Sequence, residues 1–141
     1  MPDIEVAVDK LLKMEQYVNQ LDSIKPASMD EYKKDLKTKY AVERIIQMIV
    51  DLAVDVNNVL LSYCKKPPAA DYFNSFIELS ESGVLEKTFA LKIAPSTGLR
   101  NRLVHEYEKI NDEIVYNSFQ EVIVMYNQYI KEINRFIRLE S

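Results

Sequence analysis

The sequence contains no tryptophan and has only two glycines, one cysteine and one histidine. Two glycines leave few of the tight turns that a sheet needs, so the chain favours long helices. The single cysteine, Cys64, cannot form an intramolecular disulfide, and one cysteine with one histidine cannot supply a zinc site of the usual ligand types. We therefore expect a helical protein of the reducing cytoplasm, with no metal and no cofactor.

Excess positive charge and long apolar runs are also missing. The formal net charge of −4 argues against a broad basic surface for duplex nucleic acid, although it leaves room for a local nucleic-acid site. The first residues, MPDIEVAVDKLLK, lack the regions of a signal peptide, and no run of about 18 apolar residues occurs. We expect a cytoplasmic protein without membrane contact, folded as one domain over residues 1–141.

Apolar residues recur every three or four positions, which predicts an all-α, up-down bundle of about five helices. The first helix is expected over 3–24, the second over 32–63 without a break, and the last from about 112 onward. The expected core stripe of the second helix is Tyr32, Leu36, Tyr40, Val42, Ile45, Ile49, Leu52, Val56, Val59 and Tyr63. The stripe of the last helix is Val115, Phe119, Val122, Tyr126, Ile130, Ile133 and Ile137.

Shorter helices are expected over 71–80 and 84–92, with Gly83 as a left-handed C-cap between them. Ser28 or Asp30 is expected to cap the second helix. Ser96 or Thr97 is a natural N-cap for a helix that starts after Pro95. That helix is either separate from the last one or continuous with it.

The segment GLRNRLVHEY, residues 98–107, holds the only histidine, His105, five residues after Arg100. On a helical wheel its apolar side chains form a stripe that Arg100 borders, while Asn101 and His105 share a polar face. That stripe consists of Leu99, Leu103, Tyr107, Ile110 and Ile114. The plainest interpretation of His105 is a surface or core-edge histidine bonded to Asn101 or Glu108.

The chemistry of the segment suggests a sharper interpretation. Histidine accepts and returns a proton near neutral pH, and arginine binds a phosphate through two N–H donors at once. Together they can cleave RNA without a metal. His105 would take the proton of a 2′-hydroxyl, and Arg100 would stabilise the charge that gathers on the phosphorus oxygens.

The segment resembles the R-N-x-x-V-H-x-Y pattern of the HEPN superfamily, specifically the HepT-like toxins, at Arg100, Asn101, Val104, His105 and Tyr107. Residues 41–47, AVERIIQ, also look like the A-x-E-R-x-x-Q stretch common in such proteins. The resemblance implies a helical bundle that dimerises with the motif helices across a cleft, and a metal-independent endoribonuclease activity.

The resemblance further implies roles for individual residues and a partner. Arg100 and His105 would be catalytic, and Asn101 would orient or bind the RNA substrate. A small nucleotidyltransferase antitoxin of the MntA type would add AMP units to Tyr107 and so block the site. The alternative is a non-catalytic helical subunit that partners a nucleotidyltransferase and only binds a nucleotide or RNA phosphate with these residues.

The wheel gives a geometric argument for a homodimer. Arg100 and His105 are about 140° apart around one helix, which makes it hard for both to reach one phosphate. A two-fold axis beside this helix would let Arg100 of one protomer and His105 of the other line one groove. Alternatively, the long side chain of Arg100 reaches the same phosphate as His105 within one chain.

Two other charged groups stand out. Asp51 and Asp55 lie one turn apart and resemble a metal or acid–base pair, but they lack the companion histidines of a di-iron bundle, so we interpret them as a polar face or a rim near the cleft. The lysines between 33 and 39 are interpreted as a solvated face, or alternatively as a surface that steers RNA or the antitoxin. They are Lys33, Lys34, Lys37 and Lys39.

Overall fold

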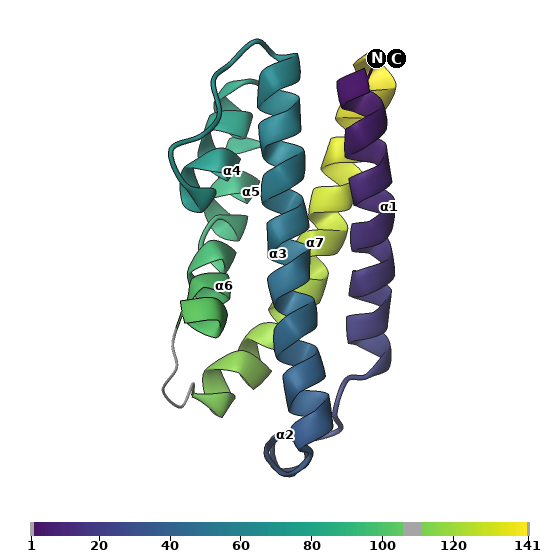
Figure 1. Cartoon of the computed structure of the whole chain (residues 1–141), viewed down its shortest axis with the longest axis vertical. Coiled ribbons are helices and arrows are strands. Elements are labelled where there is room, and N and C mark those ends of the chain that lie inside the picture. Colours follow the sequence, from purple (N-terminus) through teal and green to yellow (C-terminus); the bar gives the residue numbers. More distant parts are fainter. Residues whose placement is uncertain (1, 106–110, 141) are drawn as a thin grey trace.

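Seven helices and no strand form over the residues that the computed structural model describes, 2–105 and 111–140. The three long helices are α1 (Pro2–Ser23), α3 (Leu36–Tyr63) and α7 (Asp112–Glu140). The four short ones are α2 (Met29–Lys34), α4 (Tyr72–Glu81), α5 (Lys87–Ile93) and α6 (Ser96–His105). Figure 1 shows α1 running antiparallel to α3 and α7, with both chain ends at the same end of the bundle.

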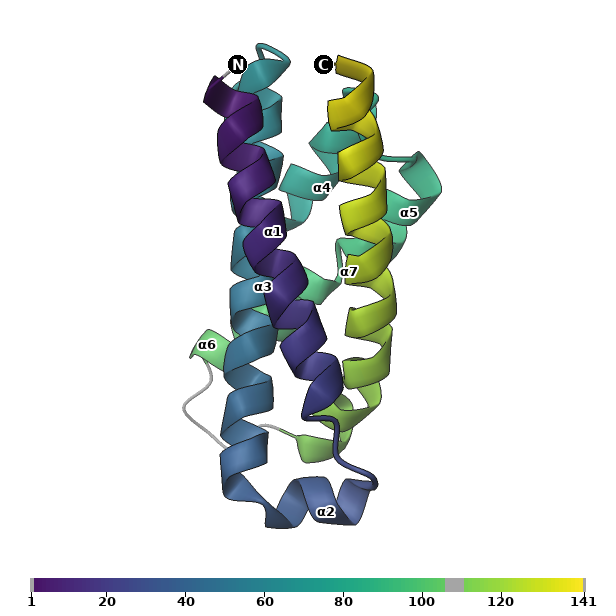
Figure 2. The same cartoon turned by 90° about the vertical axis from the view of Figure 1, so that its right-hand side faces the viewer.

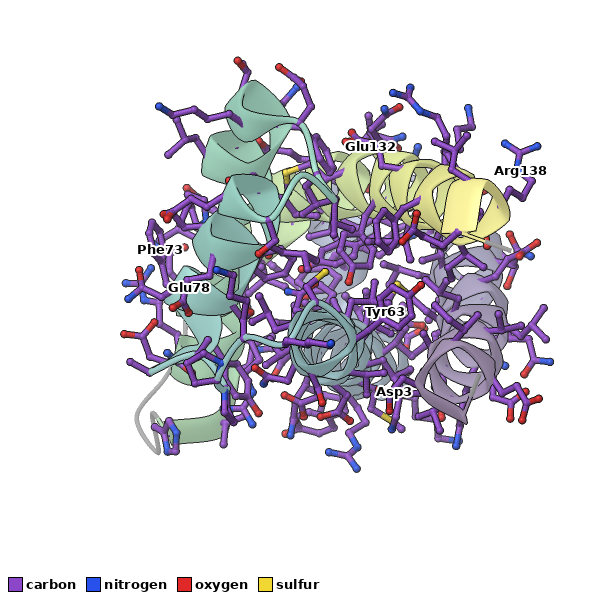
Figure 3. All side chains as sticks on the ribbon, turned by 90° about the horizontal axis from the view of Figure 1, so that it is seen from above. Asp3, Tyr63, Phe73, Glu78, Glu132 and Arg138 are labelled. Carbon is purple, nitrogen blue, oxygen red and sulfur yellow. The ribbon has the colours of Figure 1, made fainter. Side chains whose placement is uncertain are left out.

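Helix α3 occupies the middle of the bundle. Helices α4, α5 and α6 lie on the side of α3 away from α1, and α2 crosses the end of the bundle, as the two side views show (Figures 1 and 2). Seen from above, Tyr63 at the end of α3 lies between α1, marked by Asp3, and α4, marked by Phe73 (Figure 3). By length and composition α3 could cross a membrane, but half of its most apolar stretch is buried inside the bundle. Its apolar character therefore matches what a central helix needs.

The expected second helix is in fact two helices, because the chain leaves helical geometry at Asp35 (φ −96°, ψ 93°). The Asp35 carboxylate accepts a hydrogen bond from the backbone N–H of Thr38 at 3.1 Å and so caps α3. Ser28 caps α2, as predicted, by accepting from the N–H of Glu31. Counting this break and the separate α6 and α7, the bundle has more helices than the five expected.

The assignment of two residues to the core stripe of the expected second helix is wrong. Leu36 and Tyr40 are 56% and 63% exposed, because no helix in the described part of the chain covers that side of the first turns of α3. The rest of that stripe is buried or half-buried, and the α7 stripe is buried along its whole length, as predicted. Ile114, assigned to the stripe of the motif helix, lies on α7 and is 38% exposed.

The caps of the shorter helices agree only in part with the sequence. Gly83 adopts the left-handed conformation expected of a C-cap, with φ of 82°. Ser96 and Thr97 do not cap α6, because both are already helical and buried. The hydroxyls of Ser96 and Tyr126 lie 2.6 Å apart, and that of Thr97 donates to the carbonyl of Ala94.

A buried chain of hydrogen bonds joins α7, α3 and α4. The Tyr129 hydroxyl lies 2.5 Å from Asn57 Oδ1 and 3.1 Å from the carbonyl oxygen of Ala53. Asn57 Nδ2 donates to Ser75 Oγ at 2.9 Å, and that hydroxyl donates to the carbonyl of Tyr72 at 2.7 Å. Because buried polar groups are costly when unpaired, this chain fixes α4 against α3. It thereby sets the position of Tyr72.

Candidate active site

Arg100 is anchored between three helices. It leaves α6 toward α3 and α4, and its Nε donates to Asp51 Oδ1 at 2.7 Å. Its guanidinium carbon lies 4.7 Å from the centroid of the Tyr72 ring, a cation–π contact. Nη1 donates to Asn101 Oδ1 at 3.2 Å. The Arg100 side chain is only 15% exposed, so its position is well defined by these neighbours.

The anchoring leaves part of the guanidinium available. Arginine has five N–H donors in a rigid fork, of which Asp51 takes the Nε donor and Asn101 takes one on Nη1. Within the described residues no other acceptor bonds to Arg100. The remaining Nη donors are therefore able to hold a phosphate, while the charge-assisted bond to Asp51 prevents the fork from rotating.

The environment of Tyr72 keeps its ring neutral. Partial burial raises the pKa of the Tyr72 phenol, the Asp51 carboxylate raises it further, and the Arg100 cation opposes both. The phenol is consequently protonated throughout the neutral pH range. It presents an uncharged aromatic face to the cation.

His105 is the last residue of α6, and its side chain is exposed. No hydrogen bond or ion pair reaches it from the described residues. Of the two partners that the sequence suggested, Asn101 forms no hydrogen bond with His105, and its amide oxygen accepts from Arg100. Arg100 and His105 are thus on one helix, one fixed against the bundle and the other facing outward, and no hydrogen bond joins them. Tyr107, Glu108 and Ile110 lie outside the described residues.

Asp51 and Asp55 lie one turn apart on α3, as expected, but they pair with different cations. Asp51 binds Arg100 and so lies at the rim of the site, whereas Asp55 pairs at 3.3 Å with Lys10 of α1. No group of three histidine, cysteine, aspartate or glutamate side chains in ranges 2–105 and 111–140 is placed to hold a metal ion. Asp51 and Asp55 therefore form different ion pairs, although both carboxylates help to raise the pKa of Tyr72.

The sequence did not identify Tyr72 or the pairing of Asp51 with Arg100. Asp51 carried one signal, its place on the polar face of the second expected helix. Tyr72 carried none, because its contact with Arg100 depends on how α4 folds back onto α3. Both contacts join residues distant in the sequence, so helical periodicity could not reveal them.

The four lysines between 33 and 39 do not form one surface. Lys33 pairs with Glu113 at 3.6 Å, and Lys39 pairs with Asp112 at 2.8 Å in a half-buried position. Lys34 and Lys37 are exposed. The interpretation as a single solvated face is therefore wrong for Lys39, which links α3 to the start of α7.

Comparisons with known proteins agree on one family. The HepT-like ribonuclease family matches residues 14–133. The tRNA nuclease HepT of Aphanizomenon flos-aquae is 34% identical over 122 residues, which cover 86% of this chain and 83% of the relative.

Solved structures share the fold at low identity. A chain from the complex of a tri-AMPylated Shewanella oneidensis HEPN toxin with an MNT antitoxin superposes with a TM-score of 0.83 at 18% identity, covering 92% of this chain and 97% of that one. The cytosolic protein YutE of Bacillus subtilis gives a TM-score of 0.81 at 15% identity, covering 95% and 90%. The extent of the family match and the identity to the HepT relative over most of both chains show that this all-α chain belongs to the HepT-like ribonuclease family.

Proposed function

We propose that this protein is the endoribonuclease toxin of a toxin–antitoxin pair, with Arg100 and His105 as its catalytic residues. The observation that carries the proposal is the fixed guanidinium of Arg100, held by Asp51 and Tyr72 with donors left for a phosphate, on the helix that ends at an exposed histidine. The HepT relative is named a tRNA nuclease, which supports RNA as the substrate.

The proposed reaction needs no metal. His105 removes the proton of a 2′-hydroxyl, and the oxygen attacks the adjacent phosphorus while the bond from phosphorus to the 5′-oxygen breaks. The imidazolium then returns the proton to the 5′-oxygen, leaving a 2′,3′-cyclic phosphate and a 5′-hydroxyl. Arg100 stabilises the charge on the phosphorus oxygens. Asn101, whose oxygen is taken by Arg100, binds the RNA through its amide nitrogen.

The proposed active form is a homodimer. Arg100 is held toward α3 and α4, whereas His105 lies at the exposed end of α6, about 140° further around the helix. A second protomer across a two-fold axis would bring its His105 to the Arg100 of the first. An interface of roughly 1,600 Å² is the standard size for such a complex, and a monomer by light scattering would contradict it.

The proposed partner is an MntA-like nucleotidyltransferase antitoxin in the cytoplasm. One structural neighbour is described as an AMPylated HEPN toxin bound to an MNT antitoxin, and another as cytosolic. By this proposal the antitoxin adds AMP to Tyr107, two residues beyond His105. The added phosphates would occupy the donors of Arg100 and exclude RNA by charge and bulk.

Expression in a bacterial host tests the proposed function. The wild type should arrest growth, and His105→Ala should relieve the arrest. Arrest that persists in His105→Ala would instead favour the non-catalytic binding subunit. With a cognate nucleotidyltransferase co-expressed, the intact mass should rise by whole AMP units in wild type but not in Tyr107→Phe, and an unchanged wild-type mass would refute the modification alone.

A further inference from the structure

Helix α3 carries a line of polar side chains that leads to Arg100. Lys37, Arg44 and Asp51 are spaced by seven residues, so they lie on one face at intervals of about 10.5 Å. Tyr40 lies between the first two, within about 60° of each around the helix. Lys37, Tyr40 and Arg44 are all exposed, and Asp51 holds Arg100 at the end of the line.

In the described part of the chain, Lys37 and Arg44 lack the close carboxylate ion pairs that four other cations of the bundle form. Lys10, Lys33, Lys39 and Arg100 each form an ion pair with a carboxylate. Within ranges 2–105 and 111–140, Arg44 forms no such ion pair, and Lys37 has only the charge interaction with Asp35 that helps to lower the pKa of that carboxyl. Their charge is therefore available to an anionic ligand, although the protein as a whole is negative.

The exposure of Tyr40 also calls for an explanation. Its side chain is 63% exposed on a helix whose other apolar residues mostly face the core. An exposed aromatic ring between two cations is the arrangement that binds single-stranded nucleic acid, because the ring stacks on a base while the cations contact the backbone. Arg44 belongs to the AVERIIQ stretch, so this surface would give that stretch a role.

We propose that Lys37, Tyr40 and Arg44 form a track that binds single-stranded RNA and leads it to Arg100. This inference rests on the proposed ribonuclease function. A duplex is disfavoured because the track is one narrow line of cations, and because a base must be unstacked before it can pack on Tyr40. The carboxylates at the far end do not repel the strand strongly, since Asp51 and Asp55 each have a cationic partner.

Binding measurements test the track in the His105→Ala background, where RNA stays intact. The probe is an unstructured, fluorescein-labelled single-stranded RNA, followed by anisotropy at several salt concentrations. Arg44→Ala or Lys37→Ala should weaken binding by about tenfold and reduce the salt slope by about 0.7 for each phosphate that the variant no longer neutralises. Tyr40→Ala should weaken binding about fivefold or more, and Tyr40→Phe should retain it.

A matched control lies at the other end of the molecule. Arg138 is exposed near the C-terminal end of α7, labelled in Figure 3, and Arg138→Ala removes the same charge away from the track. It should leave affinity and salt slope unchanged. In cleavage assays on the wild-type background, Arg44→Ala should raise KM and leave kcat intact, as expected for a contact made equally in ground and transition states.

Three results would overturn the track. Unchanged affinity in Arg44→Ala and Tyr40→Ala would show that RNA binds elsewhere, and equal losses in Arg138→Ala would show a mere effect of net charge. Dissociation of the protein in Tyr40→Ala, seen by light scattering, would show that this face binds protein instead. None of these three results refutes the proposed function if the wild type cuts RNA and His105→Ala does not. Conversely, a wild type that binds RNA through the track without cutting it would refute the proposed nuclease activity and leave the track intact.

Discussion

The bond between Asp51 and Arg100 predicts that Asp51→Asn slows RNA cleavage, although the proposed mechanism gives Asp51 no contact with RNA. Asparagine has the same shape but lacks the charge that holds the guanidinium. A hydrogen bond to a charged group contributes about 1.5–3 kcal/mol. Because the Asp51 side chain is 33% exposed, solvent screening reduces this to about 1–2 kcal/mol. With about 1.4 kcal/mol for each factor of ten in rate, kcat should fall roughly 5- to 30-fold.

Initial rates over a range of RNA concentrations separate kcat from KM. A guanidinium that is no longer positioned loses transition-state stabilisation, so kcat should fall. KM should stay constant or decrease, because one negative charge has left the site. Asp55→Asn is the matched control, since Asp55 lies one turn further on α3 and pairs with Lys10 instead. It should leave both constants unchanged.

Two results would refute this reasoning. Wild-type kcat in Asp51→Asn, with Arg100→Ala inactive, would show that Arg100 needs no anchor. A full additional loss when Asp51→Asn is added to Arg100→Ala would show that Asp51 acts by another route, since residues that act through each other are not additive.

Three further substitutions test the surroundings of the site. Tyr72→Leu removes the cation–π contact, worth about 0.5–2 kcal/mol, and should slow cleavage about 2- to 30-fold, whereas Tyr72→Phe keeps the ring, loses only the hydrogen bond of the phenol to Asp51 and should slow cleavage less. Asn57→Ala breaks buried hydrogen bonds and leaves a cavity, so the free energy of unfolding in urea should fall by about 2–4 kcal/mol, and an unchanged value would contradict the buried chain. Burial raises the pKa of Glu43 in the folded protein above its value in the unfolded chain. As pH rises from the unfolded-state pKa through the folded-state pKa, ionisation of Glu43 therefore lowers the stability of the folded state. Glu43→Gln should therefore be more stable than wild type at about pH 7 but not below about pH 4. A difference in the free energy of unfolding that is the same at both pH values would contradict this.

Helix faces could be predicted from the sequence where a helix packs along its whole length. The α7 stripe from Val115 to Ile137 is buried as expected, because one face of that helix meets the bundle throughout. Leu36 and Tyr40 fit the same spacing but are exposed, since periodicity does not say where a neighbouring helix stops. The break at Asp35 depended on a side-chain cap that competes with helix continuation.

The site shows the same division between local and tertiary information. The motif from Arg100 to His105 is local, and the sequence identified it as the candidate chemistry. The anchors of Arg100 come from α3 and α4, and their contacts arise only when these helices pack together. In the proposed homodimer, His105 would meet the Arg100 of a second protomer, and helical periodicity within one chain does not test that arrangement.

The most direct test of the proposed ribonuclease is cleavage of RNA by the purified protein in EDTA. Transfer RNA is a suitable probe, given the name of the HepT relative. The proposal predicts that wild type cuts it with metal chelated, and that Arg100→Ala and His105→Ala each lose about 100-fold or more in rate while remaining folded. The central claim would be contradicted if EDTA abolishes cleavage by the wild type while the His105→Ala variant still cleaves RNA.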